Sequence, residues 1–448
     1  MTDARRLVDR LWSFCHVLRD DGVGAVEYVE QLTYLLFLKM AEERGADVGW
    51  RRLRSTPAVY QDLLDELAGR PGALGTVYSR ARNRIQDPAK LRRLIVLIDR
   101  EHWTGSGADV AGAAYEELLS RGAEDVKSGA GQYFTPRPVV QAMVACVRPT
   151  PADTVVDPAA GTGGFLLEAA RTATSVAGVE LVDGTARLAA MNLLLHGIGT
   201  PDGPSPVEVG DALAADPGRR YSVVLSNPPF GRRAGERAPA RADFTAATAN
   251  KQLNFVQHIA TILDTGGRAA VVVPDNVLFE GGAGETVRRR LLCDFDLHTL
   301  LRLPTGIFYA QGVKANVLFF DRTPPSGVLW VYDLRAGVHF TLKQDPLRRE
   351  HLDGFVAAYR PGEPRTSRVP GARFRPFGHA ALLARERTDL DLTWTGEPGE
   401  SGENGESGES SGDGGQEPQR LARAIVADLT AALREFEAVA AELEPGGG

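Results

Sequence analysis

Apolar residues spaced three and four positions apart dominate the first 126 residues of the chain. They recur over residues 7–18 and, after the break at Asp20-Asp21-Gly22, over residues 29–40. This spacing places apolar side chains on one face of a helix. The same pattern predicts helices over residues 60–68, 89–99 and 110–119. We therefore expect residues 1–126 to form a helical N-terminal domain that is a scaffold rather than a catalytic unit, with binding of DNA or a partner left open.

From residue 153 the pattern changes to short β-branched runs that alternate with helical stretches. The runs cover residues 154–156, 176–179, 207–209, 222–225 and 269–273. Such alternation predicts a doubly wound α/β sheet, which binds ligands at the carboxyl ends of its strands. Two further runs, 297–302 and 316–321, are close enough in sequence to pair antiparallel at the edge of the sheet. This domain is expected to span residues 127–395.

The last part of the chain has two different compositions. Residues 396–418 are rich in Gly, Ser and Glu, which predicts a flexible linker because such a segment cannot bury enough apolar surface to fold. Residues 419–444 carry apolar residues at alternating spacings of four and three, which predicts an amphipathic, coiled-coil-like helix. The helix either folds back on the catalytic body or docks on helices of a partner, and its stripe favours the partner.

The charge of the chain changes this picture less than its total suggests. The 51 Lys and Arg and 58 Asp and Glu give a net charge of −7, but residues 396–418 hold seven acids and no base. The remaining 51 acids balance the 51 bases, so the body is neutral and nucleic acid is not excluded as a partner. Three separated cysteines without a CxxC pair or a His cluster argue against a disulfide framework and a metal site. Without a signal peptide or an apolar span, we expect a cytoplasmic protein that has no membrane partner.

A glycine-rich loop, Asp157-Pro158-Ala159-Ala160-Gly161-Thr162-Gly163-Gly164-Phe165, follows the first predicted strand and opens a helix. Glycines let the backbone approach a ligand closely, and a helix N-terminus supplies free N–H donors. A dinucleotide fingerprint would need a further glycine where this chain has Leu166, which disfavours a nicotinamide or flavin cofactor. We predict that Asp157, Ala160, Gly161, Thr162 and Gly163 bind a different nucleotide cofactor.

Two acids follow the next two predicted strands. Glu180 is placed to bind the two hydroxyls of a ribose, and Asp211 is placed to meet an adenine amino group. Either acid alone could be an ordinary helix cap. Three acids at three successive strand ends, counting Asp157, favour a cofactor site.

The segment Ser226-Asn227-Pro228-Pro229-Phe230-Gly231 follows the fourth predicted strand. A rigid proline turn would need neither the Asn nor the aromatic residue. The N6 amine of adenine is a poor nucleophile, and the Asn227 side-chain oxygen and the Pro228 carbonyl can accept hydrogen bonds from its two hydrogens while Phe230 stacks on the base. Prolines preorganise both acceptors. We therefore predict Asn227, Pro228, Pro229 and Phe230 as the catalytic residues, acting on a base flipped out of the duplex, with S-adenosylmethionine as methyl donor and no metal.

With these residues in place, the chain closely resembles the modification (methyltransferase) subunit of type I restriction–modification systems over nearly all of residues 5–395. The likeness rests on GQYFTPR, DPAAGTGGF, SNPPFG, NKQLNFVQHI and LLRLPTGIFYAQGVKANVLFFDR. It implies a class I S-adenosylmethionine-dependent methyltransferase fold, with a Rossmann-like sheet, that methylates adenine N6 in double-stranded DNA. It also implies an assembly of two modification subunits with one specificity subunit, to which a restriction subunit can add.

The resemblance also implies roles for individual positions. Besides residues 160–163, Glu180 and Asp211, it assigns cofactor binding to an upstream loop, whose aromatic rings suit a sulfonium or an adenine edge. Its residues are Gln132, Tyr133, Phe134, Thr135, Pro136 and Arg137. Without the resemblance, this loop would be a glycine-rich lead-in to a helix at 138–146, with Thr135 as its cap.

Arginine-rich residues 231–243 follow the predicted base pocket directly. We hypothesise that Arg232, Arg233 and Arg237 contact phosphates beside the flipped base, against the alternative of a solvated loop. The sequence leaves two rival functions open. One is methylation of cytosine N4 or of a protein glutamine in a similar pocket, and the other is a non-catalytic subunit that only scaffolds an assembly.

Overall fold

The structure is a computed structural model, and it describes residues 9, 13, 25–103, 115–117, 119, 135–231, 239, 241–308, 313–335, 340–342 and 345–394. The predicted linker 396–418 and the predicted helix 419–444 lie outside these residues. So does the predicted helix over residues 7–18, except for Asp9 and Ser13, which are helical.

One nine-stranded sheet runs through the described catalytic region, in the order β3-β2-β1-β4-β5-β7-β6-β8-β9. Its strands are β1 (Thr154–Asp157), β2 (Ser175–Glu180), β3 (Val207–Val209), β4 (Tyr221–Ser226), β5 (Leu263–Pro274), β6 (Asp296–Arg302), β7 (Ala315–Asp321), β8 (Val328–Asp333) and β9 (Phe374–Gly378). The first five are parallel, and β7 runs antiparallel between β5 and β6. All seven predicted strands are therefore present.

The antiparallel pairing predicted for 297–302 and 316–321 is confirmed as β6 and β7. The sheet continues beyond this pair, because β8 lies parallel to β6 and β9 pairs antiparallel with β8. Neither of these strands was predicted. Strand β9 contains Pro376, which has no backbone N–H for a ladder and is tolerated because β9 is an edge strand.

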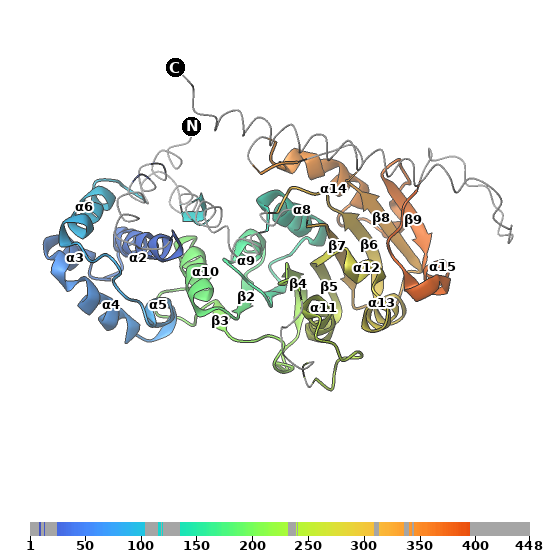
Figure 1. Ribbon diagram of the computed structural model, residues 1–448, viewed down its shortest axis with the longest axis horizontal. Helices are drawn as coiled ribbons and strands as arrows, with labels where there is room; N and C mark the ends of the chain where they lie inside the picture. Colours follow the sequence, from blue (N-terminus) through green and yellow to red (C-terminus); the bar gives the residue numbers. More distant parts are fainter. Residues whose placement is uncertain are drawn as a thin grey trace, which may run out of the picture. The chain divides into compact units, whose positions relative to one another are not determined.

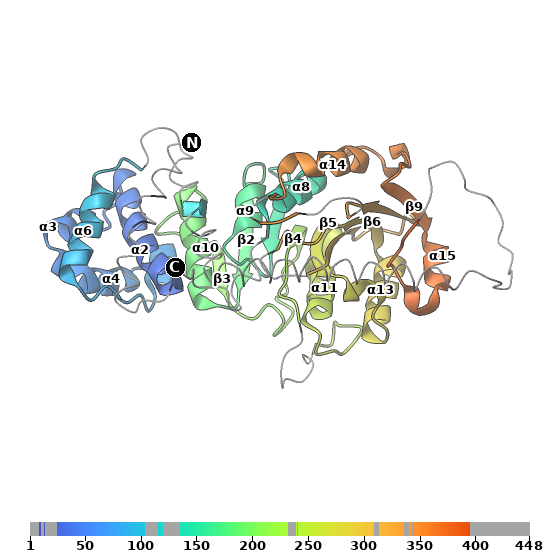
Figure 2. The same ribbon diagram turned by 45° about the horizontal axis from the view of Figure 1, so that its top comes forward.

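Helices cover both faces of the sheet (Figures 1 and 2). On one face lie α8 (Arg137–Val147), α9 (Gly164–Ala169) and α14 (Asp353–Tyr359); on the other lie α11 (Lys251–Ile262), α12 (Asn276–Phe279), α13 (Ala283–Asp294) and α15 (His379–Ala384). Neighbouring strand residues divide between the two cores: Val223 and Leu225 face α8, and Val224 faces α11. Period-two alternation thus builds a three-layer α/β domain.

The helical region contains α2 (Ala25–Glu43), α3 (Trp50–Ser55), α4 (Tyr60–Ala68), α5 (Gly72–Tyr78) and α6 (Pro88–Asp99). Helices α2, α4 and α6 confirm the predictions over 29–40, 60–68 and 89–99. Helix α6 begins at Pro88, one residue before the predicted start, with Asp87 as its N-cap: the Asp87 side chain accepts a hydrogen bond from Ala89 N. Of the predicted helix at 110–119, residues 115–117 and 119 are described and are helical.

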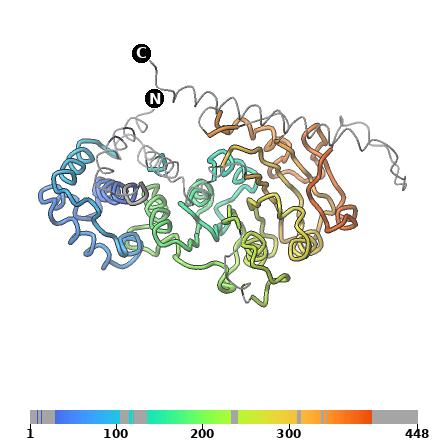
Figure 3. The backbone as a smooth tube through the Cα atoms, viewed as in Figure 1, coloured from blue at the N-terminus to red at the C-terminus, as the bar shows by residue number. Residues whose placement is uncertain are grey.

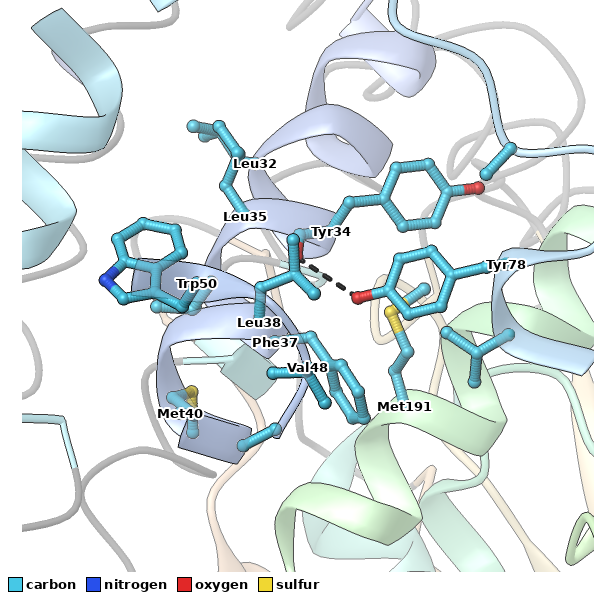
Figure 4. Packing of buried hydrophobic residues seen from close by; sticks show 14 of the residues in the cluster. Leu32, Tyr34, Leu35, Phe37, Leu38, Met40, Val48, Trp50, Tyr78 and Met191 are labelled. Carbon is cyan, nitrogen blue, oxygen red and sulfur yellow. Dashed lines mark hydrogen bonds between the residues drawn. The ribbon is translucent and has the colours of Figure 1, made fainter. Parts of the chain in front are cut away.

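Helix α10 (Asp183–Leu195) belongs to two cores, although it is far from the helical region in sequence. It lies beside α2 and α5 (Figure 3). Met191 of α10 packs among Tyr34, Phe37 and Tyr78, and Tyr78 Oη donates to the Tyr34 carbonyl (Figure 4). On its other side, α10 packs against α9 and β3. The division at residue 126 therefore separates segments of sequence that share one hydrophobic core.

Two features are absent from the described ranges. No helix there is long and apolar enough to cross a bilayer. The same residues contain no group of His, Cys, Asp and Glu side chains that could hold a metal ion.

Candidate active site

The carboxyl ends of the central parallel strands bring most of the predicted site residues together. Asp157 ends β1, Glu180 ends β2, and Asn227 follows β4 directly. Asp211 lies two residues after β3. Parallel strands end on the same edge of a sheet, so residues that are far apart in sequence meet there.

A pocket opens at this edge. Its lining residues are Glu116, Leu119, Thr135, Arg137, Val140, Asp157, Ala159, Ala160, Gly161, Thr162, Gly164, Phe165, Asn192 and Asn227. It therefore joins the glycine-rich loop of residues 157–165, the segment before α8 and the Asn of the Asn-Pro-Pro-Phe motif. Predicted residues that are described but do not line it are Pro136, Gly163, Glu180, Asp211, Pro228, Pro229 and Phe230. Gln132, Tyr133 and Phe134 lie outside the described residues.

Two polar lining residues were not predicted from the sequence. Asn192 lies in α10, and its Nδ2 donates to the Thr162 carbonyl at 3.0 Å. Glu116 lies in the helical region, ahead of every motif. Neither has a local sequence signal, because each reaches the pocket only through the packing of its helix.

The backbone of the glycine-rich loop has the shape that its glycines allow. Gly161 and Gly163 have φ values of +54° and +85°, in the left-handed region that favours glycine. A Cβ added to Gly161 or Gly164 would meet no atom within 4 Å, so both glycines border open space. The loop thus leaves a concave backbone surface at the pocket.

The carboxylates of Glu180 and Asp211, near the ends of β2 and β3, accept hydrogen bonds from backbone N–H groups. Glu180 accepts hydrogen bonds from Gly161 N and Val182 N, both at 2.9 Å. Asp211 Oδ1 accepts one from Leu213 N at 2.9 Å. Three exposed apolar side chains, Leu181, Val182 and Val209, flank the two acids.

Asp157 ties two strand ends together. It is 1% exposed, and its Oδ1 accepts hydrogen bonds from Ser226 Oγ at 2.7 Å and Ala159 N at 3.0 Å. Burial raises the pKa of Asp157 to about 7, and the charge of Glu180 adds to the rise against the two hydrogen bonds. Asp157 therefore fixes the glycine-rich loop to the strand that precedes Asn227.

Asn227 has one satisfied and one unsatisfied polar atom. Its Nδ2 donates to Thr135 Oγ1 at 2.9 Å, whereas its buried Oδ1 has no hydrogen-bond partner among the residues described. Thr135 does not cap α8, whose N-cap is Pro136 without a side-chain bond. The hydroxyl of Thr135 instead fixes the orientation of the Asn227 amide. In this orientation the Asn227 Oδ1 lies at the pocket without a hydrogen-bond partner among the described residues.

Arg137 lines the pocket, and its positive charge is paired with two glutamates. It forms ion pairs with Glu116 at 2.9 Å and Glu168 at 3.2 Å. Burial raises the pKa of Glu116, and the charge of Arg137 opposes that rise. Arg137 therefore links α8 to both the helical region and α9.

Of the arginine-rich segment, Arg232, Arg233 and Arg237 lie outside the described residues. Arg241, which is described, is 9% exposed and pairs with Asp243 at 2.7 Å. It also stacks over the Phe244 ring, 4.4 Å from its centroid. Arg241 therefore stabilises the loop itself.

Comparison with known proteins identifies the family of the chain. The family model described as N-6 DNA Methylase matches residues 106–368, and the HsdM N-terminal domain model matches residues 7–48. The chain is 37% identical to the type I restriction enzyme StySJI methylase subunit of Salmonella typhimurium, over 98% of this chain and 96% of that one. It is 36% identical to the EcoKI methylase subunit of Escherichia coli, over 98% and 95%.

Solved structures show the same relation. The crystal structure of the EcoKI M protein matches with a TM-score of 0.54 and 33% identity, covering 98% of this chain and 97% of that one. A structure from a type I restriction–modification system matches with a TM-score of 0.71 and 27% identity over the full length of both chains. The chain therefore belongs to the N-6 DNA methylase family, among the methylase subunits of type I restriction enzymes.

Proposed function

We propose that Asn227, Pro228, Pro229 and Phe230 form the pocket in which this adenine-specific DNA methyltransferase receives its target base. The observation that carries the proposal is the Asn227 Oδ1 atom, which is buried at the pocket without a hydrogen-bond donor among the described residues. An unpaired buried acceptor costs roughly 1–3 kcal/mol, so a site that keeps one is suited to a ligand that donates. The N6 amine of adenine is such a donor.

The residues present fit S-adenosylmethionine, the methyl donor of this enzyme. Open space beside Gly161 and Gly164 leaves room for a ligand against the backbone. Glu180 and Asp211, flanked by exposed Leu181, Val182 and Val209, offer carboxylates and apolar surface to an adenosine. When bound, the cofactor supplies an electrophilic methyl group on a sulfonium. We assign its binding to residues 132–137, Asp157, residues 160–163, Glu180 and Asp211.

The protein contributes by accepting hydrogen bonds from the target amine and by orienting the base. The Asn227 side-chain oxygen and the Pro228 carbonyl accept from the two N6 hydrogens, which favours a nitrogen lone pair directed out of the ring. Thr135 holds the Asn227 amide in the orientation that this requires. Phe230 stacks on the base, and the two prolines keep both acceptors in place before the base arrives.

A base inside a duplex cannot reach an acceptor buried at the end of β4. The target adenine must therefore leave the helix, at a cost of roughly a few kcal/mol. We infer that the chain acts on DNA within a complex containing a specificity subunit, in a ratio of two modification subunits to one, to which a restriction subunit can add. The predicted helix 419–444 is our candidate for the partner contact. Because DNA is the substrate, we place the protein in the cytoplasm.

Substitution of Asn227 tests the pocket directly. In Asn227→Ala we expect methyl transfer by the assembled complex to fall by about 10²- to 10³-fold, the range measured when one preorganised electrostatic partner is removed. The assay follows labelled methyl from S-adenosylmethionine into unmethylated host DNA. Cofactor affinity, measured by calorimetry, serves as the control and should stay within about threefold, since most cofactor contacts are unchanged.

Two kinds of outcome would count against the proposal. Undiminished transfer in Asn227→Ala would mean that the subunit is a scaffold. Label at cytosine N4, or in protein, would assign the pocket to a different amine. Sequencing of methylated adenines in the host, with and without the intact gene, then gives the recognition sequence.

A further inference from the structure

We propose that Gln252 is a positioning residue for the loop of residues 227–231, called here the target-base loop, and that it acts through the backbone of Gly231. The inference rests on the proposed role of Asn227 to Phe230 as the base pocket, and it extends that role to a side chain on α11. Gln252 belongs to the segment NKQLNFVQHI, which resembles the family but supplies none of the proposed pocket residues.

The first observation is a two-point attachment of Gly231 to the start of α11. Gly231 N donates to Gln252 Oε1 at 3.0 Å, and the Gly231 carbonyl accepts from Lys251 N at 3.1 Å. Gly231 has φ +106°, a backbone conformation that residues with a side chain rarely adopt. The chain thus turns sharply directly after Phe230, and Gln252 fixes that turn.

The second observation is that Gln252 is itself held in place. It is 5% exposed, and its Nε2 donates to Asn276 Oδ1 at 3.5 Å. Asn276 Nδ2 donates to Glu280 Oε2 at 3.1 Å, and the same oxygen accepts from Asn250 Nδ2 at 3.0 Å. Asn250 is the N-cap of α11, with its Oδ1 accepting from Leu253 N. Hydrogen bonds therefore run from the loop through α12 and back to the helix that carries Gln252.

These contacts place the target-base loop between two anchors. Thr135 holds its first residue, Asn227, and Gln252 holds Gly231 at its end. Between them, Phe230 is partly buried against the core under α8, where a small shift would change its angle to a stacked base. Because a displacement of about 1 Å can cost about 100-fold in rate, loss of either anchor should slow the chemical step.

A structural role for Gln252 is the alternative, and α11 provides a matched control. Gln257 lies on the same helix, is 1% exposed, and also clamps a backbone segment. Its Oε1 accepts from Ala246 N at 2.9 Å, and its Nε2 donates to the Ala246 carbonyl at 3.0 Å. Removing either glutamine deletes a buried amide, but only Gln252 touches the loop that begins at Asn227.

The experiment compares Gln252→Met with Gln257→Met in the full-length chain within its assembled complex. Single-turnover transfer of labelled methyl to unmethylated host DNA is measured at saturating S-adenosylmethionine, together with cofactor affinity and the thermal midpoint. We expect Gln252→Met to be slower by about 10- to 100-fold with cofactor affinity within about twofold. Gln257→Met should lower the midpoint comparably and keep a rate within about threefold of the parent.

Equal rate loss in both variants, or an unchanged rate in Gln252→Met, would overturn the proposal. If Gln252→Met does not fold, Gln252→Asn keeps the amide but withdraws it from Gly231 by one methylene, and it should show the same selective loss. Failure here is distinct from failure of the pocket itself. A fully active Asn227→Ala variant would reject the proposed base pocket. An inactive Asn227→Ala variant together with a fully active Gln252→Met variant would reject only the positioning role of Gln252.

Discussion

Asp157 and Asn227 lie at adjacent strand ends in opposite hydrogen-bonding states. The Asp157 Oδ1 accepts two hydrogen bonds, from Ser226 and Ala159, while the Asn227 Oδ1 accepts none from the described residues. Through its Oδ1, Asp157 therefore also holds the glycine-rich loop in place, whereas the Asn227 Oδ1 is available to a ligand. Each role follows from what surrounds the side chain rather than from its type, since both were chosen from sequence for their polar groups.

The raised pKa of Asp157 gives a pH dependence of stability. A carboxyl whose pKa is about 7 when folded and near 4 when unfolded keeps its proton longer in the folded state. Its contribution is therefore fully present below pH 4 and is lost as the pH rises to about 7. In Asp157→Asn, whose Oδ1 can still accept from Ser226 and Ala159, this loss should disappear.

The measurement is urea unfolding of parent and variant, without cofactor, at several values between about pH 4.5 and 8, which covers most of the interval between the two pKa values. We expect the stability of Asp157→Asn relative to the parent to increase steadily with pH. A pH-independent difference would contradict the raised pKa of Asp157. Other titrating groups cancel in the comparison because they are common to both proteins.

At the scale of elements, α10 connects the helical region with the pocket in which we propose that the cofactor binds. Its first turn follows Glu180, its Asn192 lines the pocket, and its Met191 is buried in the helical core. Arg187, also on α10, is 8% exposed and pairs with Glu30 of α2 at 2.8 Å and Asp183 at 3.0 Å. Helix α10 is thus fixed by contacts with the helical region and with the sheet domain. A change in the packing of one core should therefore shift α10 and disturb the other core.

Truncation of Met191 tests this connection. Met191→Ala should lower the free energy of unfolding by about 2–5 kcal/mol, as for other large-to-small core changes, and weaken cofactor binding several-fold through Asn192. Leu64→Ala is the matched control, because Leu64 is fully buried in the same core but lies on α4. It should lose similar stability and keep its cofactor affinity. Equal weakening by both variants would show a general loss of stability rather than coupling through α10.

At the scale of the molecule, the net charge of −7 comes from one segment of the chain. Seven acids without a base fall in residues 396–418, so the remainder of the chain is neutral. Local arginine clusters can therefore meet DNA without opposition from the overall charge. Affinity for DNA depends on such local phosphate contacts and falls with salt.

Neutralising Arg232, Arg233 and Arg237 to Gln tests the proposed phosphate contact. We expect weaker binding, with the slope of log K against log salt reduced by up to about 2.7, which is about 0.9 for each phosphate that an arginine no longer neutralises. The control is Arg148→Gln with Arg360→Gln, two residues that line a different pocket together with Arg268 of β5. Their removal should leave the slope unchanged. A slope that the first set of substitutions does not alter would reject the phosphate contact.

Much of the fold could be predicted because its signals are local. Short β-branched runs identified β1 to β7, and apolar residues three and four positions apart identified α2, α4 and α6. Strands β8 and β9 were not predicted. Strand β9 is a short edge strand interrupted by Pro376, whereas β8 has the sequence VLWVYD, whose β-branched and aromatic residues are typical of a strand. For the site, the acids at strand ends and the Asn-Pro-Pro-Phe motif could be predicted, because a strand followed by a polar residue is itself a local pattern.

The sequence by itself determined seven of the nine described strands, the order of the acids at their ends and the family. Only the tertiary structure decided which residues meet: Thr135 with Asn227 across 92 positions, Asp157 with Ser226 across 69, and Gln252 with Gly231 across 21. It also decided that α10 completes the helical core. The physical reason is that periodicity reports which face of an element is buried. It does not report against which distant segment that face packs, and the hydrogen bonds that orient the site depend on that packing.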